Sequence, residues 1–142
     1  MAAFSEQEQQ QIRIAIEKAE KATSGEIRIC IEKKCKGEVL DEAANYFTKL
    51  EMNQTALRNG VLIYVATDDH KFAIIGDAGI NRVVPKDFWD NAKENMLESF
   101  KAGDLAGGII KGITMAGQQL KAYFPNQDND KNELSDDIAY MD

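Results

Sequence analysis

The stretch VLIYVA at residues 61–66 is apolar at every position, and it constrains the fold more than any other part of the chain. A strand with this pattern is buried on both faces, whereas a strand with one wet face alternates apolar and polar residues. Asn59-Gly60 precedes the stretch, and the short link Thr67–His70 returns the chain into residues 71–75 as a hairpin. The pattern therefore predicts a central strand in a sheet that other elements cover on both sides.

A second strand is predicted upstream, where isoleucines alternate with other residues over positions 26–32. Apolar residues at helical spacing lie on both sides of this strand. They cover residues 12–22, behind a capping box of Ser5 and Glu8, and residues 40–50. The connection between the two strands is then a β-α-β unit, which is right-handed and makes the strands parallel.

Two further helices are predicted after the hairpin. Pro85 suits the first turn of one, whose apolar stripe extends to Phe100, and Asp104 can cap the other, which extends to Phe124. Each glycine inside the last helix costs about 1 kcal/mol in helix propensity and so indicates close packing. The element order α-β-α-β-β-α-α predicts a three-layer α/β/α sandwich around a small mixed β-sheet.

The length of 142 residues, 44% of them apolar, is enough for one domain with a single core. We place this domain at residues 4–125. The last segment, residues 126–142, follows Pro125 and carries −5 of the net charge of −7. We expect it to be an acidic, disordered tail that contributes nothing to the core.

Composition and targeting signals exclude several classes of protein. The net charge of −7 repels phosphate backbones, so we expect no nucleic acid partner. No apolar stretch approaches eighteen residues, so we expect no membrane insertion. The N-terminal residues lack the features of a signal peptide, and the two cysteines cannot form a disulfide framework, so we expect a cytoplasmic protein.

Three separated segments, SGEIRICIE, RNGVLIYVATDDHKFAIIGDAGI and FKAGDLAGGIIKGITMAGQQL, follow one another in the chain. In this order they resemble the TPM-domain family, which is named after a thylakoid-lumen protein, a photosystem II repair protein and a nematode receptor auxiliary protein. The resemblance extends from Ile12 to Phe124. It implies an α/β/α sandwich and, for some members, bound calcium and a weak acid phosphatase activity.

This sequence also departs from the common pattern of the family. Many relatives carry a signal peptide and a transmembrane helix, and their glycine loop begins with a Gly-aromatic-Gly turn. Here the loop is Gly76-Asp77-Ala78-Gly79, and neither targeting segment is present. We therefore expect a stand-alone domain.

A candidate metal site follows from the predicted strand directions. Glu26 and Asn59 begin parallel strands and Asp77 ends the antiparallel one, so all three lie at the same edge of the sheet. Asp104, within the last family motif, is the residue most able to join them. Carboxylate and amide oxygens without histidine or thiolate suit calcium, with magnesium as the alternative. Equally, all four residues can be read as ordinary turn, cap and ion-pair formers.

The opposite edge of the sheet is a competing location, because ligands of open α/β sheets usually bind at the carboxyl ends of parallel strands. Asp68 and Asp69 lie there with His70, but we interpret the two aspartates as turn formers. His70 is the only histidine, and no G-x-S-x-G motif supplies a nucleophile for it. Cys30 lies on a predicted strand, where simple packing is the more common role.

Three functional hypotheses remain from the sequence, and no catalytic residue is assigned. The first is a non-enzymatic cation-binding module, with calcium as the first candidate, that acts in the assembly or maintenance of a protein complex with an unidentified partner. The second is a metal-assisted phosphomonoester hydrolase that uses the same carboxylates. The third is a metal-free interaction domain whose acidic tail recruits a basic partner.

Overall fold

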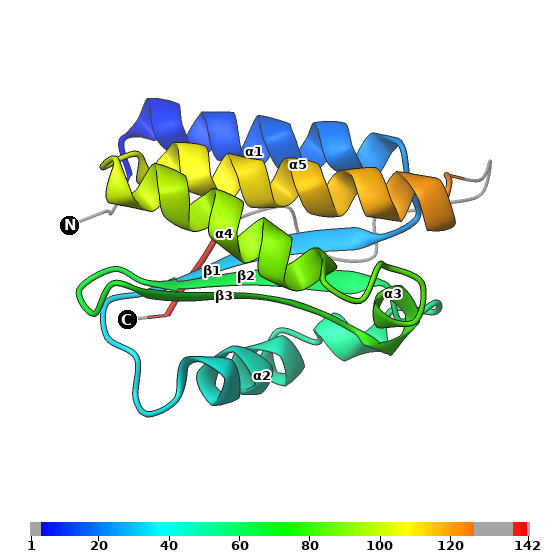
Figure 1. The fold of residues 1–142 in the computed structure, drawn as a ribbon, viewed down its shortest axis with the longest axis horizontal. Coiled ribbons are helices and arrows are strands. Elements are labelled where there is room, and N and C mark those ends of the chain that lie inside the picture. The colour runs from blue at the N-terminus through cyan, green and yellow to red at the C-terminus, as the bar shows by residue number, and fades with distance from the viewer. Residues whose placement is uncertain (1–3, 127–137, 142) are drawn as a thin grey trace.

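The computed structural model describes residues 4–126 and 138–141, and it has three layers (Figure 1). A mixed sheet lies between three long helices on one face and one helix on the other, which confirms the predicted α/β/α sandwich. The elements are α1 (Glu6–Lys21), β1 (Glu26–Glu32), α2 (Val39–Lys49), the 3-10 helix η1 (Met52–Gln54), β2 (Gly60–Ala66), β3 (Lys71–Gly76), α3 (Ala78–Asn81), α4 (Phe88–Lys101), α5 (Leu105–Tyr123) and β4 (Ala139–Tyr140).

The sheet has the strand order β3-β2-β1-β4. Strands β1 and β2 are parallel, in a register that pairs Glu26 with Gly60 and Glu32 with Ala66, and β2 and β3 form the antiparallel hairpin. Both strand directions predicted from the sequence are confirmed. Every residue of β2 is buried, as its continuous apolar pattern requires.

The alternation along β1 divides the core into two parts. Its isoleucines pack with α1, α4 and α5 on one face of the sheet. Cys30 points to the other face, where it packs with Tyr64 of β2 and Phe47 of α2. Cys30 is therefore a packing residue, as the sequence indicated.

The glycines of α5 allow the helices of the upper layer to pack closely. A Cβ atom at Gly108 would lie 2.3 Å from the ring of Phe100, and one at Gly112 would lie 2.7 Å from Met96 Sδ. Both neighbours belong to α4, so any larger residue would push the two helices apart. Glycine lowers the helix propensity at these positions, and this loss is the cost of packing the two helices closely.

Helix boundaries follow the predicted caps at two helices and depart from prediction at a third. Ser5 and Glu8 form both hydrogen bonds of a capping box at α1, and the Asp104 carboxylate accepts a hydrogen bond from Gly107 N at 2.9 Å at the start of α5. The α4 helix begins at Phe88, whereas Pro85 lies in the preceding turn. Between β3 and this turn lies α3, which the sequence pattern did not reveal.

The last described residues belong to the body of the domain. In β4, Ala139 pairs with Cys30 and Tyr140 with Ile31, and Met141 N donates to Ile31 O at 2.8 Å. Ile138 and Ala139 are buried. The expectation that the chain beyond Pro125 contributes nothing to the core is therefore wrong for residues 138–141, while the rest of the expected tail, 127–137 and 142, lies outside the described residues.

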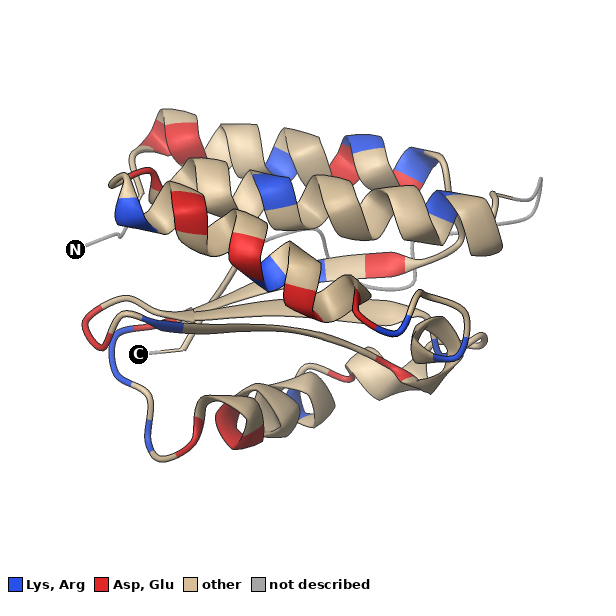
Figure 2. Ribbon diagram, in the orientation of Figure 1, with Lys and Arg blue, Asp and Glu red and all other residues tan. Residues whose placement is uncertain are grey.

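Charged residues of both signs are distributed over the helices and loops (Figure 2). None of the helices in the described part of the chain combines the length and the apolarity needed to cross a membrane. The charged positions on the sheet are concentrated at strand ends, and these ends position the candidate site.

Candidate functional site

The structure brings three of the four candidate metal ligands together at one edge of the sheet. Glu26 N donates to Asn59 O at 3.4 Å, and Asp77 N donates to Gly60 O at 2.9 Å. The three residues are 2%, 1% and 7% exposed, in the order Glu26, Asn59 and Asp77. Two carboxylates and one amide thus lie buried where β1 and β2 begin and β3 ends.

Asp77 has a partner that sequence reasoning missed. Arg58 Nε and Nη2 donate to Asp77 Oδ2 and Oδ1 at 2.6 and 2.8 Å, and Oδ1 also accepts from Ala78 N at 2.7 Å. The hydrogen bond to this carboxylate raises the pKa of Arg58. Because the Arg58 side chain is 52% exposed, the ion pair has one side in solvent and is worth little stability.

The loop that carries Asp77 is fixed by a close approach of two backbone segments. Gly79 N donates to Arg58 O at 2.8 Å, and a Cβ atom on Gly79 would lie 2.1 Å from Leu57 O. Only glycine allows α3 to lie this close to the turn before β2. Asp77 caps α3, so the same contact that places the helix also holds the carboxylate beside Arg58.

Asn59 has an acceptor atom without a partner. Its backbone N donates to Thr55 Oγ1 at 3.2 Å, and its Nδ2 donates to Ser24 Oγ at 3.4 Å. Its Oδ1 atom is buried and has no hydrogen-bond partner within residues 4–126 and 138–141. Since buried polar atoms are normally paired, this oxygen indicates a place for a water molecule or a cation.

Asp104 does not join the other three residues. At the far end of α5, Ser24 N donates to Phe124 O, so that end of the helix lies beside the start of β1. A helix of 19 residues is roughly 28 Å long, and Asp104 caps its other end. Asp104 therefore lies at the hairpin end of the molecule and acts as a helix cap (Figure 1).

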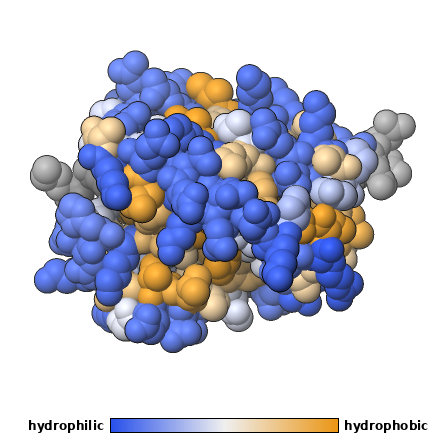
Figure 3. All heavy atoms as spheres, in the orientation of Figure 1, coloured by the Kyte–Doolittle hydropathy of each residue, from blue (hydrophilic) through white to orange (hydrophobic). Residues whose placement is uncertain are grey.

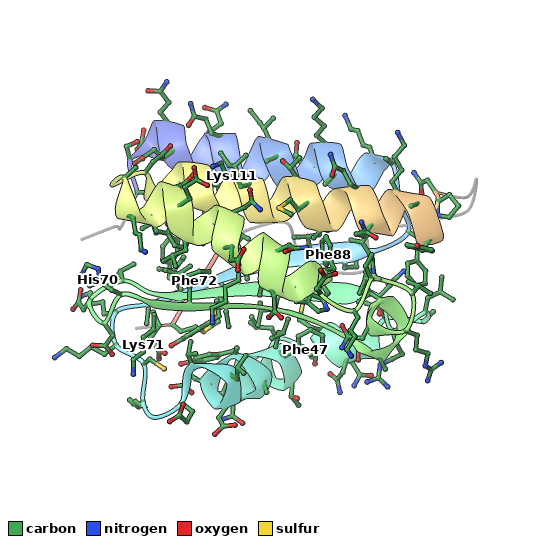
Figure 4. The ribbon with its side chains drawn as sticks, viewed as in Figure 1. Phe47, His70, Lys71, Phe72, Phe88 and Lys111 are labelled. Atoms are coloured by element: carbon green, nitrogen blue, oxygen red, sulfur yellow. The ribbon has the colours of Figure 1, made fainter. Side chains whose placement is uncertain are left out.

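The hairpin end is the competing edge, and the structure shows how its residues are used. Asp69 Oδ2 accepts from Cys35 N at 2.7 Å, which ties two loops together. His70 has φ 53°, within the turn, and lies at the end of the sheet remote from α3 (Figure 4). A pocket of about 320 Å³ opens here, lined mostly by apolar residues such as Phe72 and Leu97. The interpretation of Asp69 as a loop-forming residue agrees with this geometry.

Buried polar groups also gather at the carboxyl end of β1. The two oxygens of Glu32 accept from the hydroxyls of Tyr46 and Tyr64, each at 2.5 Å. The hydrogen bond to Glu32 raises the pKa of Tyr46, and burial raises the pKa of Tyr64. Burial, followed by the charge of Glu32, raises the pKa of Cys30 to about 12. All three groups stay protonated at neutral pH, so this network supplies no nucleophile.

The described part of the chain contains no cluster of three or more His, Cys, Asp and Glu side chains able to hold a metal ion. The edge at Asn59 instead offers two carboxylates and one unpaired amide oxygen. These are donors that a hard cation accepts, together with water. One of these carboxylates, that of Asp77, already accepts hydrogen bonds from the Arg58 guanidinium.

Known proteins resemble this chain over nearly its whole length. The family model of the TPM domain matches residues 1–119. The NMR structure of the BA42 protein from the psychrophilic bacterium Bizionia argentinensis is 44% identical, with a TM-score of 0.91, and covers 99% of this chain and 97% of that one. No curated protein matches the chain in sequence.

Two more distant structures share the fold at 14% identity. The N-terminal domain of the cg2496 protein from Corynebacterium glutamicum has a TM-score of 0.66 and covers 83% of this chain and 74% of that one. The N-terminal domain of a protein from P. gingivalis has a TM-score of 0.69, with 85% and 78% covered.

Proposed function

Because the chain belongs to the TPM-domain family, we propose that it is a divalent-cation-binding module, with calcium as the first candidate, that acts in the assembly or maintenance of a protein complex. The observation that carries the cation part is the buried Oδ1 atom of Asn59, which has no partner in the described residues and lies at the edge that also holds Glu26 and Asp77. A bound cation would give this oxygen the partner that it lacks. The role in a protein complex is proposed by analogy with the photosystem II repair protein of the family.

Arg58 is the competitor for the cation in this proposal. Its guanidinium neutralises Asp77, and its half-exposed side chain can leave into solvent without unfolding any element. The cation then takes the place of the guanidinium on the carboxylate. Calcium suits three irregularly placed protein oxygens better than magnesium, which demands near-ideal octahedral geometry, and water completes the six to eight ligands of calcium.

We expect a modest affinity, because only two carboxylates contribute charge. Modules of this kind bind calcium with dissociation constants of about 0.1 to 1 mM. Asp104 is not a ligand in this proposal, since it caps α5 at the other end of the sheet.

The hydrolase alternative has less support at this edge. In this alternative Asp77 or Asp104 would assist proton transfer, but Asp77 is held by two hydrogen bonds from Arg58 and Asp104 caps α5 at the other end of the sheet. The only histidine of the chain, His70, lies at the opposite edge and cannot serve as the general acid here. Cation binding without turnover is therefore the function that the site supports best.

Isothermal titration with calcium chloride tests the proposal on the wild type and three variants. Asp77→Asn should weaken binding about tenfold, because a ligand loses its charge and keeps its shape. Arg58→Gln should strengthen binding about two- to five-fold, because the competing cation is removed. The matched control Asp104→Asn should bind as the wild type does.

Circular dichroism would confirm that the variants keep their fold. An absence of heat up to about 10 mM calcium, well past the expected affinity range, would refute cation binding. If Asp104→Asn removed binding while Asp77→Asn did not, the site would lie at the hairpin edge and the assignment here would fail.

A further inference from the structure

The outer edge of β3 is an unpaired sheet edge. Within residues 4–126 and 138–141, β3 pairs only with β2. Hydrogen-bonded pairs alternate along an antiparallel ladder, and Asp77 N donates to Gly60 O. By this alternation Ala73 and Ile75 bond to β2, whereas Phe72 and Ile74 direct their N–H and C=O groups outward. The edge thus presents a short row of backbone donors and acceptors.

This edge forms the floor of a groove of about 380 Å³. Its walls are Leu40 of α2 on one side and Trp89, Asp90 and Lys93 of α4 on the other, with residues 73–76 between them. In Figure 1, β3 is the front strand of the sheet. Figure 3, in the same orientation, shows apolar atoms in this region with hydrophilic atoms above and below them. Leu40 is 60% exposed, which is unusual for a leucine beside a core.

One end of the groove is closed by a side-chain network. Asn81 Nδ2 donates to Gly76 O at 2.9 Å, and Trp89 Nε1 donates to Asn81 Oδ1 at 2.8 Å. This network satisfies the outward carbonyl of Gly76 and holds the indole as a wall. The outward groups of Phe72 and Ile74 receive no comparable cover from the described residues.

We propose that this groove binds an extended, basic segment of a partner protein, which adds a strand to β3. Strand addition uses the backbone groups of the sheet edge for affinity and the groove walls for the choice of side chains. The edge contains no proline or bulge, and Lys71 at its start is the only charged residue that opposes pairing.

The charge of the chain favours a basic segment as the occupant of the groove. The exposed charged residues of α4 are three carboxylates, Asp90, Glu94 and Glu98, and two lysines, Lys93 and Lys101, and of these Asp90 and Lys93 line the groove. The chain as a whole carries a net charge of −7. A second copy paired through β3 would bring two chains of the same net charge together, whereas a basic strand is attracted to that charge. The proposal does not depend on cation binding, so each can fail while the other stands.

The probe is a capped synthetic peptide in which Thr and Val alternate between two terminal Lys pairs, titrated into the ¹⁵N-labelled full chain. We expect the amide resonances of Phe72 and Ile74 to shift, and their hydrogen exchange to slow, at peptide concentrations of about 1 mM or below. A peptide with methyl groups on alternate backbone nitrogens should not bind, since it cannot complete the ladder. A peptide with Glu pairs in place of Lys should bind at least about threefold more weakly.

Two exposed leucines provide a matched pair of variants. Leu40→Ala removes a wall of the groove and should weaken binding of the Lys peptide about threefold or more, whereas Leu57→Ala, 50% exposed and outside the groove, should not. Equal binding of the methylated peptide, or shifts away from β3, would overturn the proposal. Protection of Phe72 and Ile74 that grows with protein concentration and without peptide would assign the edge to a second copy and also overturn it.

Discussion

At the scale of single residues, the environment of Cys30 keeps its thiol protonated and so lowers its reactivity. The thiol is buried beside Glu32, whose oxygens accept from Tyr46 and Tyr64. Burial and this negative charge raise the pKa of Cys30 to about 12 from an ordinary value of 9.0. A thiol with a raised pKa in the folded state stays protonated after the same thiol in the unfolded chain has ionised.

This shift predicts a loss of stability at high pH. Below about pH 9 both states hold the Cys30 proton, and between about pH 9 and 12 only the folded state holds it, so the free energy of unfolding falls as the pH rises. The slope that this one group contributes is about 1.4 kcal/mol per pH unit at most. Urea unfolding of the wild type and Cys30→Ala at several pH values isolates it. Equal slopes in the two proteins would show that Cys30 does not carry the effect.

At the scale of elements, α3 is placed by contact of its backbone with the turn before β2. Gly79→Ala would set a Cβ atom 2.1 Å from Leu57 O and 2.7 Å from Arg58 O, and because both are backbone atoms, relieving the clash requires a costly shift of the backbone. We expect a loss of about 1–3 kcal/mol in the free energy of unfolding. Chemical denaturation measures it. Full stability in Gly79→Ala would mean that α3 can lie further from this turn than the structure has it.

The matched substitution in a helix is Gly107→Ala. Its Cβ atom would meet the Asp104 carboxylate at 2.1 Å, and this side chain can rotate away. The lost cap costs about 0.5–2 kcal/mol and the gain in helix propensity is about 1 kcal/mol, so the net change should be small. A loss as large as that of Gly79→Ala would show that Asp104 is held more rigidly than a helix cap.

The elements also show where sequence reasoning succeeds. The alternation of β1 and the continuous apolar run of β2 gave both strands, since these patterns depend on burial alone. The helix α3 has four residues and β4 has two, which is too short for any periodicity. Both exist because of tertiary contacts, with Arg58 O for α3 and with β1 for β4. A single sequence contains no local signal for such contacts.

The sequence predicted the candidate site only as far as the strand directions determine it. Parallel pairing of β1 and β2 and the hairpin were enough to bring Glu26, Asn59 and Asp77 together. Asp104 was assigned to the site because it belongs to a family motif. The preceding helix α4, about 21 Å long, brings the chain to the opposite edge of the sheet before Asp104 is reached. Arg58 was missed because an arginine in a turn normally faces solvent, and nothing in its spacing indicated the contact with Asp77.

At the scale of the whole molecule, the last strand closes the edge of the sheet at β1. Ile138 and Ala139 are buried there, and burial of a side chain such as Ile138 contributes about 1.5–3 kcal/mol. Truncation after Asn126 should therefore lower the thermal midpoint by roughly 4–8 °C. The substitution Ile138→Ser in the full chain should reproduce part of this loss. An unchanged midpoint in the truncated chain would show that β4 adds nothing to stability.

The central claim concerns the whole edge at Asn59, and an amide-shift titration with calcium tests it most directly. We expect the largest shifts to cluster at residues 25–27, 58–60 and 76–80, with half-saturation at about 0.1 to 1 mM calcium, and the amides of Asp104 and Asp69 to stay in place. Shifts confined to residues 68–71 or 103–105, or none up to about 10 mM calcium, would contradict it.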